Sequence, residues 1–178
     1  MVVANHSASE DYFQFFGLSP QFSLDLAQLD LAYLAIQKEV HPDRHTQGSD
    51  SEQRIAMQMA TLANTAHQTL KHPIQRGLYL CKLHGVEANL ETNTAMPTAF
   101  LLQQMAWRDS LDENADDDFA ALDALAIEVD SAYKAALVEL AEAMDRTHNY
   151  QRAAELLRGL LFIDKFATEL DDAIAALA

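Results

Sequence analysis

The sequence predicts an all-α protein built from two helical modules. Glycine (5) and proline (4), which interrupt helices, together supply about 5% of the 178 residues, against about 12% in ordinary proteins. The best helix formers are abundant, with 30 alanines and 25 leucines. Hydrophobic residues make up 49% of the chain, which is enough to build a core. We therefore expect a folded and mostly helical chain.

The first module is predicted to begin with a short helix and the first arm of a helical hairpin. The short aromatic helix covers 11–16 and ends at Gly17, where glycine suits a helix C-terminus. A second helix over 25–40 is stopped by Pro42. Its apolar residues fall on one face at helical spacing, namely Leu29, Tyr33, Ile36 and Val40.

A third and a fourth helix complete this module after a polar loop over 43–50. Ser49 and Glu52 have the spacing of a capping box at the start of the third helix. Pro73 ends that helix and suits the first turn of a fourth helix over 74–83. The inner face of the third helix is predicted to consist of Ile55, Met59, Leu62, Ala66 and Leu70.

The second module is predicted to be a three-helix bundle. Its helices cover 98–111, 117–144 and 150–177, and the last carries an apolar seam with alternating spacings of 4 and 3 residues. That seam is Leu156, Leu160, Ile163, Ala167, Leu170, Ile174 and Leu177. The predicted division of the chain is an N-terminal extension, a first domain, a linker and a second domain, over 1–10, 11–84, 85–96 and 97–178.

Charge and cysteine content exclude several functional classes. Residues 1–84 have a net charge of −2 and residues 85–178 have a net charge of −13, which disfavours nucleic-acid binding. Membrane-spanning runs of about 20 apolar residues do not occur in the sequence. One cysteine, Cys81, excludes an internal disulfide framework, and the first residues resemble neither a secretory signal nor a transit peptide. We therefore expect a cytoplasmic protein.

Catalytic and metal-binding motifs are lacking. The sequence contains no phosphate-binding glycine loop, G-x-S-x-G or H-E-x-x-H string. His41 and His45 are four residues apart, but Pro42 breaks the helical face that would bring them together, and Cys81 with His84 is half of a ligand set. We therefore expect no enzymatic activity, no bound metal and no cofactor.

The string His41-Pro42-Asp43 follows an amphipathic helix and opens a polar loop before the next one. Proline makes such a turn rigid, and the aspartate offers a carboxylate that an arginine of a partner protein could bind. The same string is also compatible with an ordinary helix stop that carries a solvated aspartate. The residues alone favour the two interpretations equally.

Longer strings resemble a known family. The segments DYFQFFGL (11–18), HPDR (41–44) and LANTAHQTLKHPIQRGLYL (62–80) resemble a J domain, the module that engages DnaK-type chaperones. The segments TAFLLQQMAWRDSLDE (98–113) and LRGLLFIDKF (157–166) resemble the C-terminal three-helix domain of the HscB family of iron–sulfur co-chaperones.

The resemblance implies an adaptor that joins two proteins. His41, Pro42 and Asp43, flanked by Lys38 and Arg44, would dock on the DnaK-like chaperone HscA and stimulate its ATPase. The C-terminal domain would hold the iron–sulfur scaffold protein IscU. J domains usually carry several basic residues on the second helix, whereas this one has Lys38 alone, so we expect a weak electrostatic contribution to docking.

A helical wheel of residues 98–111 independently predicts two apolar faces. Phe100, Trp107 and Leu111 cluster on one face, which suits the bundle core. A second apolar stripe lies on the other side, beside two charged residues, and it consists of Leu101, Leu102 and Met105 with Arg108 and Asp109 as neighbours.

The resemblance assigns this stripe, with Phe162 of the last helix, to client binding. Ala106 stands where the family often has an acid. Three alternatives stay open at this stage: the stripe could pack against the first module, the client could be another protein, or the chain could be a helical scaffold without a chaperone role.

Overall fold

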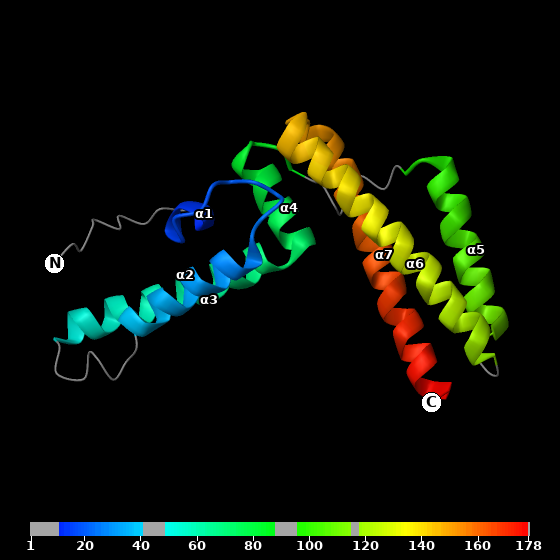
Figure 1. Cartoon of the computed structure of the whole chain (residues 1–178), viewed down its shortest axis with the longest axis horizontal. Coiled ribbons are helices and arrows are strands. Elements are labelled where there is room, and N and C mark those ends of the chain that lie inside the picture. Colours follow the sequence, from blue (N-terminus) through cyan, green and yellow to red (C-terminus); the bar gives the residue numbers. More distant parts are fainter. Residues whose placement is uncertain (1–10, 41–48, 88–95, 115–117, 178) are drawn as a thin grey trace. The chain divides into compact units, whose positions relative to one another are not determined.

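The computed structural model describes residues 11–40, 49–87, 96–114 and 118–177, and every regular element among them is a helix (Figure 1). The chain divides into two compact units, Met1–Leu83 and His84–Ala178. In chain order the first unit contains α1 (Tyr12–Phe15), α2 (Leu26–Val40), α3 (Asp50–Lys71) and α4 (Pro73–Leu83). The second contains α5 (Thr98–Asn114), α6 (Phe119–Ala141), the π-helical turn η2 (Glu142–Arg146) and α7 (Tyr150–Leu177).

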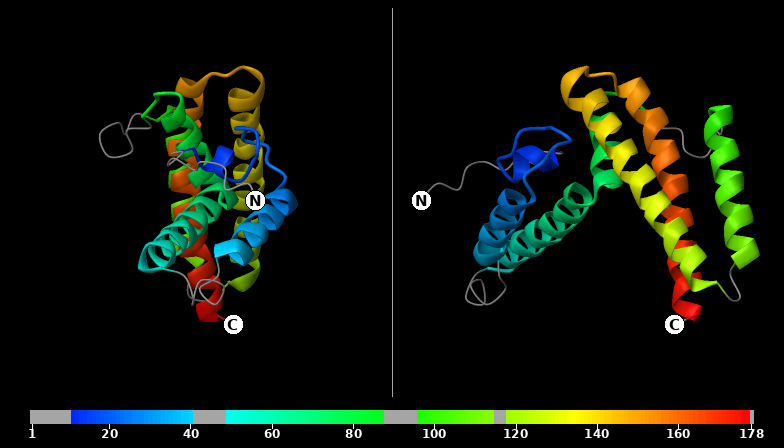
Figure 2. Two further views of the ribbon diagram at one scale, coloured as in Figure 1. Left: turned by 90° about the vertical axis from the view of Figure 1, so that its left-hand side faces the viewer. Right: turned by 45° about the vertical axis from the view of Figure 1, so that its right-hand side comes forward.

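Helices α2 and α3 form an antiparallel hairpin in the first unit (Figures 1 and 2). Polar residues join the two helices along one side. The Tyr33 hydroxyl and the Gln37 amide both donate to Oδ1 of Asn64, at 2.9 and 2.8 Å. The expected capping box at the start of α3 is present, since Ser49 and Glu52 bond to each other's backbone. These bonds fix both the register of the hairpin and the start of its second arm.

The predicted inner face of α3 is partly wrong. Ala66 and Leu70 are buried as expected, but the Ile55 side chain is 54% exposed. The buried positions are instead Ala56, Ala63, Ala66, His67 and Leu70. His67 is drawn inward because its ring is bonded to Asp30 and stacks on Tyr33, with ring centroids 4.2 Å apart. The helix is therefore rotated away from the face that apolarity alone indicates.

Arg76 of α4 ties together three segments of the first unit. Its buried guanidinium donates from Nε to the carbonyl oxygen of Phe22 at 2.8 Å and from Nη1 to the carbonyl oxygen of Leu70. The same group lies over the Phe22 ring, 5.0 Å from its centroid. Arg76 therefore holds the segment before α2 against the junction of α3 and α4.

The second unit is a bundle whose core lies between α5, α6 and α7. The buried cluster takes residues from all three helices: Trp107, Leu111, Leu122, Leu125, Val129, Ile163, Phe166 and Leu170. The predicted seam of α7 is confirmed in part. Leu160, Ile163 and Leu170 are buried, but the buried Leu157 and Phe166 lie outside the predicted seam.

The predicted end of the middle helix is wrong. Regular α-helix stops at Ala141, and the chain continues through the π-helical turn. There the Thr147 N–H donates to the carbonyl oxygen of Glu142 at 3.0 Å, five residues earlier. At the other end, the Asp118 side chain caps the helix through the Ala121 N–H.

Replacement of Arg76 by methionine should strongly destabilise the first unit. Arg76→Met keeps most of the aliphatic length but leaves two buried carbonyls without their donor, at a cost on the order of 3 kcal/mol. Urea denaturation followed by circular dichroism measures this loss. Arg54→Met, at an exposed position of α3, is the matched control and should change stability little. A stable Arg76→Met variant would show that the three segments are held by other contacts.

A second prediction concerns the Asp30 carboxylate. Hydrogen bonds from His67 (2.6 Å) and Lys71 (3.3 Å) lower the pKa of Asp30 below its usual value of 3.8. A carboxylate with a lowered pKa stabilises the folded state above its usual pKa, and this contribution disappears as the pH falls through the folded-state pKa. Asp30→Asn should therefore be less stable than the parent protein at neutral pH, and the difference should shrink below pH 3.8. Thermal melts across pH test this, and a constant difference would exclude a contribution from the charge.

Candidate functional site

Helix α5 presents an apolar surface on each of two faces. On the inner face Trp107 and Leu111 are buried, and Phe100 packs partly buried against the same core. On the outer face the side chains of Leu101, Leu102 and Met105 are 47%, 61% and 62% exposed. Large apolar residues gathered on one exposed face of a helix whose other face is already packed indicate a binding surface.

Two contacts of Trp107 fix the rotation of α5 about its axis. The indole Nε1–H donates to the Glu128 carboxylate of α6 at 2.7 Å. The indole ring also stacks on Phe166 of α7, with centroids 5.7 Å apart. Because one side chain is held by both neighbouring helices, the opposite face of α5 is held outward.

Phe162 of α7 lies at the edge of α5. Its side chain is 50% exposed, and its ring meets Phe100 edge to face, with centroids 6.5 Å apart. The aromatic contact keeps the Phe162 ring next to α5 while half of its surface stays accessible. We call the exposed residues Leu101, Leu102, Met105 and Phe162 the α5 patch.

Charged residues border the α5 patch. Arg108 of α5 forms an ion pair with Glu169 of α7 at 2.7 Å, and its guanidinium lies 5.5 Å from the centroid of the Phe166 ring. Asp109 is exposed on the same helix. Sequence reasoning selected Arg108 and Asp109 but missed Glu169, because nothing in the local pattern shows which residue of α7 lies opposite Arg108.

The residues expected to contact a chaperone lie around the loop between α2 and α3. His41, Pro42, Asp43 and Arg44 are outside the described residues. Lys38 is described, and it is exposed in the last turn of α2. The loop is therefore bounded by the end of α2 at Val40 and the capped start of α3 at Asp50.

Burial of the Cys81 thiol in α4 raises its pKa to about 11, so the thiol is neutral near pH 7 and is a poor nucleophile or metal ligand. Within the described ranges, no group of three or more His, Cys, Asp or Glu side chains is placed to hold a metal ion. None of the helices in those ranges is both long and apolar enough to cross a bilayer.

Comparison with known proteins gives the family. Residues 96–171 match the family model described as the HSCB C-terminal oligomerisation domain. A Ralstonia nicotianae protein named co-chaperone protein HscB homolog is 44% identical over 170 residues, which cover 95% of this chain and 97% of that protein. A Burkholderia multivorans protein of the same name is 46% identical over 92% of this chain and 94% of its own length. The chain belongs to the HscB family of co-chaperones.

Solved structures extend this assignment to both units. The chaperone HscB from Vibrio cholerae matches with a TM-score of 0.82 and 33% identity over 94% of this chain and 99% of its own. The human co-chaperone protein HscB matches with a TM-score of 0.85 and 29% identity over 92% of this chain and 82% of its own. The predicted fold class, an all-α chain with an N-terminal J domain and a C-terminal helical bundle, is therefore confirmed for this HscB-family chain.

Proposed function

We propose that this HscB-family chain delivers the iron–sulfur scaffold protein IscU to the DnaK-like chaperone HscA. Membership of the family gives the role of a co-chaperone in iron–sulfur cluster biogenesis, and the proposal names the partners and the surfaces. Residues 11–84 would act as the J domain and residues 97–178 as the client-binding domain, with 1–10 as an extension and 85–96 as a linker. We further propose that the protein works in the cytoplasm.

The observation that supports client binding is the exposure of the α5 patch. Its four side chains are between 47% and 62% exposed, although the opposite face of α5 is packed in the core. Apolar residues surrounded by charged ones have the anatomy of a protein interface, with an apolar centre and a polar rim. Here the rim includes Arg108, Glu169 and Asp109. We propose that IscU covers this patch.

Chaperone binding would use the other unit. Asp43 supplies a carboxylate suited to an arginine of the chaperone, and His41 and Pro42 shape the turn that presents it. Lys38 and Arg44 flank the motif. A loop that binds one conformation of the chaperone more tightly than another shifts the chaperone toward that conformation, which is enough to stimulate ATP hydrolysis. This mechanism needs no catalytic group, metal or cofactor in the co-chaperone, and the net charge of −15 disfavours nucleic acid as a partner.

Asp43→Asn should abolish stimulation of the chaperone ATPase. The substitution keeps the size of the side chain but removes the charge that an arginine of the chaperone would bind. Steady-state ATPase measurements with purified HscA test this, and client binding measured by calorimetry should be unchanged. Full stimulation by a folded Asp43→Asn variant would remove the motif from the proposal. A loss of helix content would instead favour the interpretation of the motif as a helix stop.

The combined variant Leu101→Ala, Leu102→Ala, Met105→Ala should bind IscU at least about tenfold more weakly, which corresponds to about 1.4 kcal/mol. Apolar anchors at the centre of an interface commonly cost more than this when they are truncated. Because the three side chains are exposed, the melting temperature should change little. Calorimetry with IscU measures the affinity, and the variant should still stimulate HscA when no client is present.

A matched control is available in the first unit. Leu31, Leu34 and Met57 are 68%, 53% and 71% exposed, and they are the same residue types. Their combined replacement by alanine should leave IscU affinity unchanged. Two results would contradict the assignment of the α5 patch: a large drop in melting temperature of the α5 variant, or unchanged IscU affinity in a stable one.

A further inference from the structure

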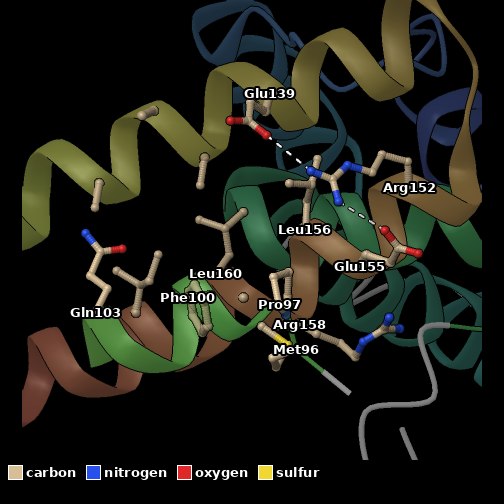
Figure 3. A pocket seen from close by; sticks show the side chains of 15 residues that line it. Met96, Pro97, Phe100, Gln103, Glu139, Arg152, Glu155, Leu156, Arg158 and Leu160 are labelled. Carbon is tan, nitrogen blue, oxygen red and sulfur yellow. Dashed lines mark hydrogen bonds and ion pairs between the residues drawn. The ribbon is translucent and has the colours of Figure 1, made fainter. Parts of the chain in front are cut away.

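The second unit contains a cavity of about 590 Å³ that the proposed function does not use. Its walls are formed by the first turns of α5, the second half of α6 and the first half of α7 (Figure 3). Its volume falls in the range of about 300–1,000 Å³ that is typical of small-molecule sites. No residue of the α5 patch lines it.

The cavity exists because the core-side residues of α6 are large in its first half and small in its second half. In the first half of α6, large residues such as Leu125 and Val129 fill the space against α5 and α7. In the second half the residues that line the cavity are Ala132, Ala135 and Ala136, followed by Glu139 at its end. A helix with small residues at core-facing positions cannot fill the space between two neighbours that remain apart. The apolar wall is completed by larger side chains, among them Phe100, Leu160 and Ile163.

The charged groups at one end of the cavity include a mutually paired set. Arg152 forms ion pairs with Glu139 at 3.5 Å and with Glu155 at 3.0 Å (Figure 3). Arg158 is the other arginine that lines the cavity, so the two arginines and two glutamates sum to no net charge. Away from this end, Gln103 adds an uncharged amide that can donate and accept hydrogen bonds.

We propose that this cavity binds an uncharged, chain-like apolar molecule that carries one hydrogen-bonding head group, such as a long-chain alcohol. The alanine, leucine and phenylalanine walls suit an aliphatic chain, and the Gln103 amide suits a hydroxyl or carbonyl group. An anion of the same length is disfavoured, because the two arginines and two glutamates that line the cavity already sum to no net charge and supply no excess positive charge to offset the desolvation of a carboxylate. The uncharged head group is therefore the distinguishing feature of the ligand.

The proposal is tested with the full chain and a neutral fluorescent dye, N-phenylnaphthylamine, which reports apolar sites. Decanol should displace the dye, and decanoate should do so at least about tenfold less effectively, a difference of about 1.4 kcal/mol. The cavity-filling variant Ala136→Phe should lose dye binding. Ala124→Phe is the matched control, since Ala124 is exposed on the same helix and lies about 18 Å from Ala136 at 1.5 Å per residue.

A neutral dye could also bind an exposed apolar surface. The variant Leu101→Ala, Leu102→Ala, Met105→Ala should therefore bind the dye as tightly as the parent protein does, which separates the cavity from the α5 patch. If Ala136→Phe does not fold, Ala132→Leu fills the same space with a smaller side chain. Equal binding by a folded, filled variant would overturn the proposal. So would equal displacement by decanol and decanoate, or no displacement by either, whatever the outcome of the IscU experiments.

Discussion

The double contact of Trp107 is the constraint on which the candidate client site depends. A helix of mixed composition such as α5 could expose several of its faces, but the indole is bonded to Glu128 of α6 and stacked on Phe166 of α7. These contacts lie on different helices, so rotation of α5 would break one or both of them. The exposure of Leu101, Leu102 and Met105 is thus a consequence of how the opposite face is held, and needs no separate cause.

Arg76 has a comparable role in the first unit. Its buried guanidinium joins the segment before α2 to the end of α3. Arg76 therefore holds together the two ends of the α2–α3 hairpin that lie opposite the predicted chaperone motif. Each unit contains its own anchoring side chain and its own candidate surface. Because the two surfaces lie on separate units, a substitution in one can be tested without loss of the other, which is what an adaptor between a client and a chaperone requires.

The parts of the fold that were predictable from sequence are those determined by local pattern. The regular apolar spacing of α7 predicted part of its buried face, and the helical wheel of α5 placed Trp107 inward and Met105 outward. The inner face of α3 was mispredicted because His67 is buried through Asp30, a partner 37 residues away. The cavity beside Ala136 could not be predicted from the sequence either, because its volume depends on the distances between three helices and not on any single segment. The motif at His41, Pro42 and Asp43 lies outside the described residues and stays a prediction.

Charge and apolar exposure together favour a partner of different sequence over a second copy for the α5 patch. Two copies that met through it would bring together two halves that each carry a net charge of −13. Like charges on that scale oppose association at low ionic strength and keep a protein soluble even where apolar residues are exposed. A client without this charge meets no such barrier and can bury the same four side chains. If the client binds the α5 patch as proposed, the acidic charge of residues 85–178 would oppose self-association of this exposed apolar surface before the client binds.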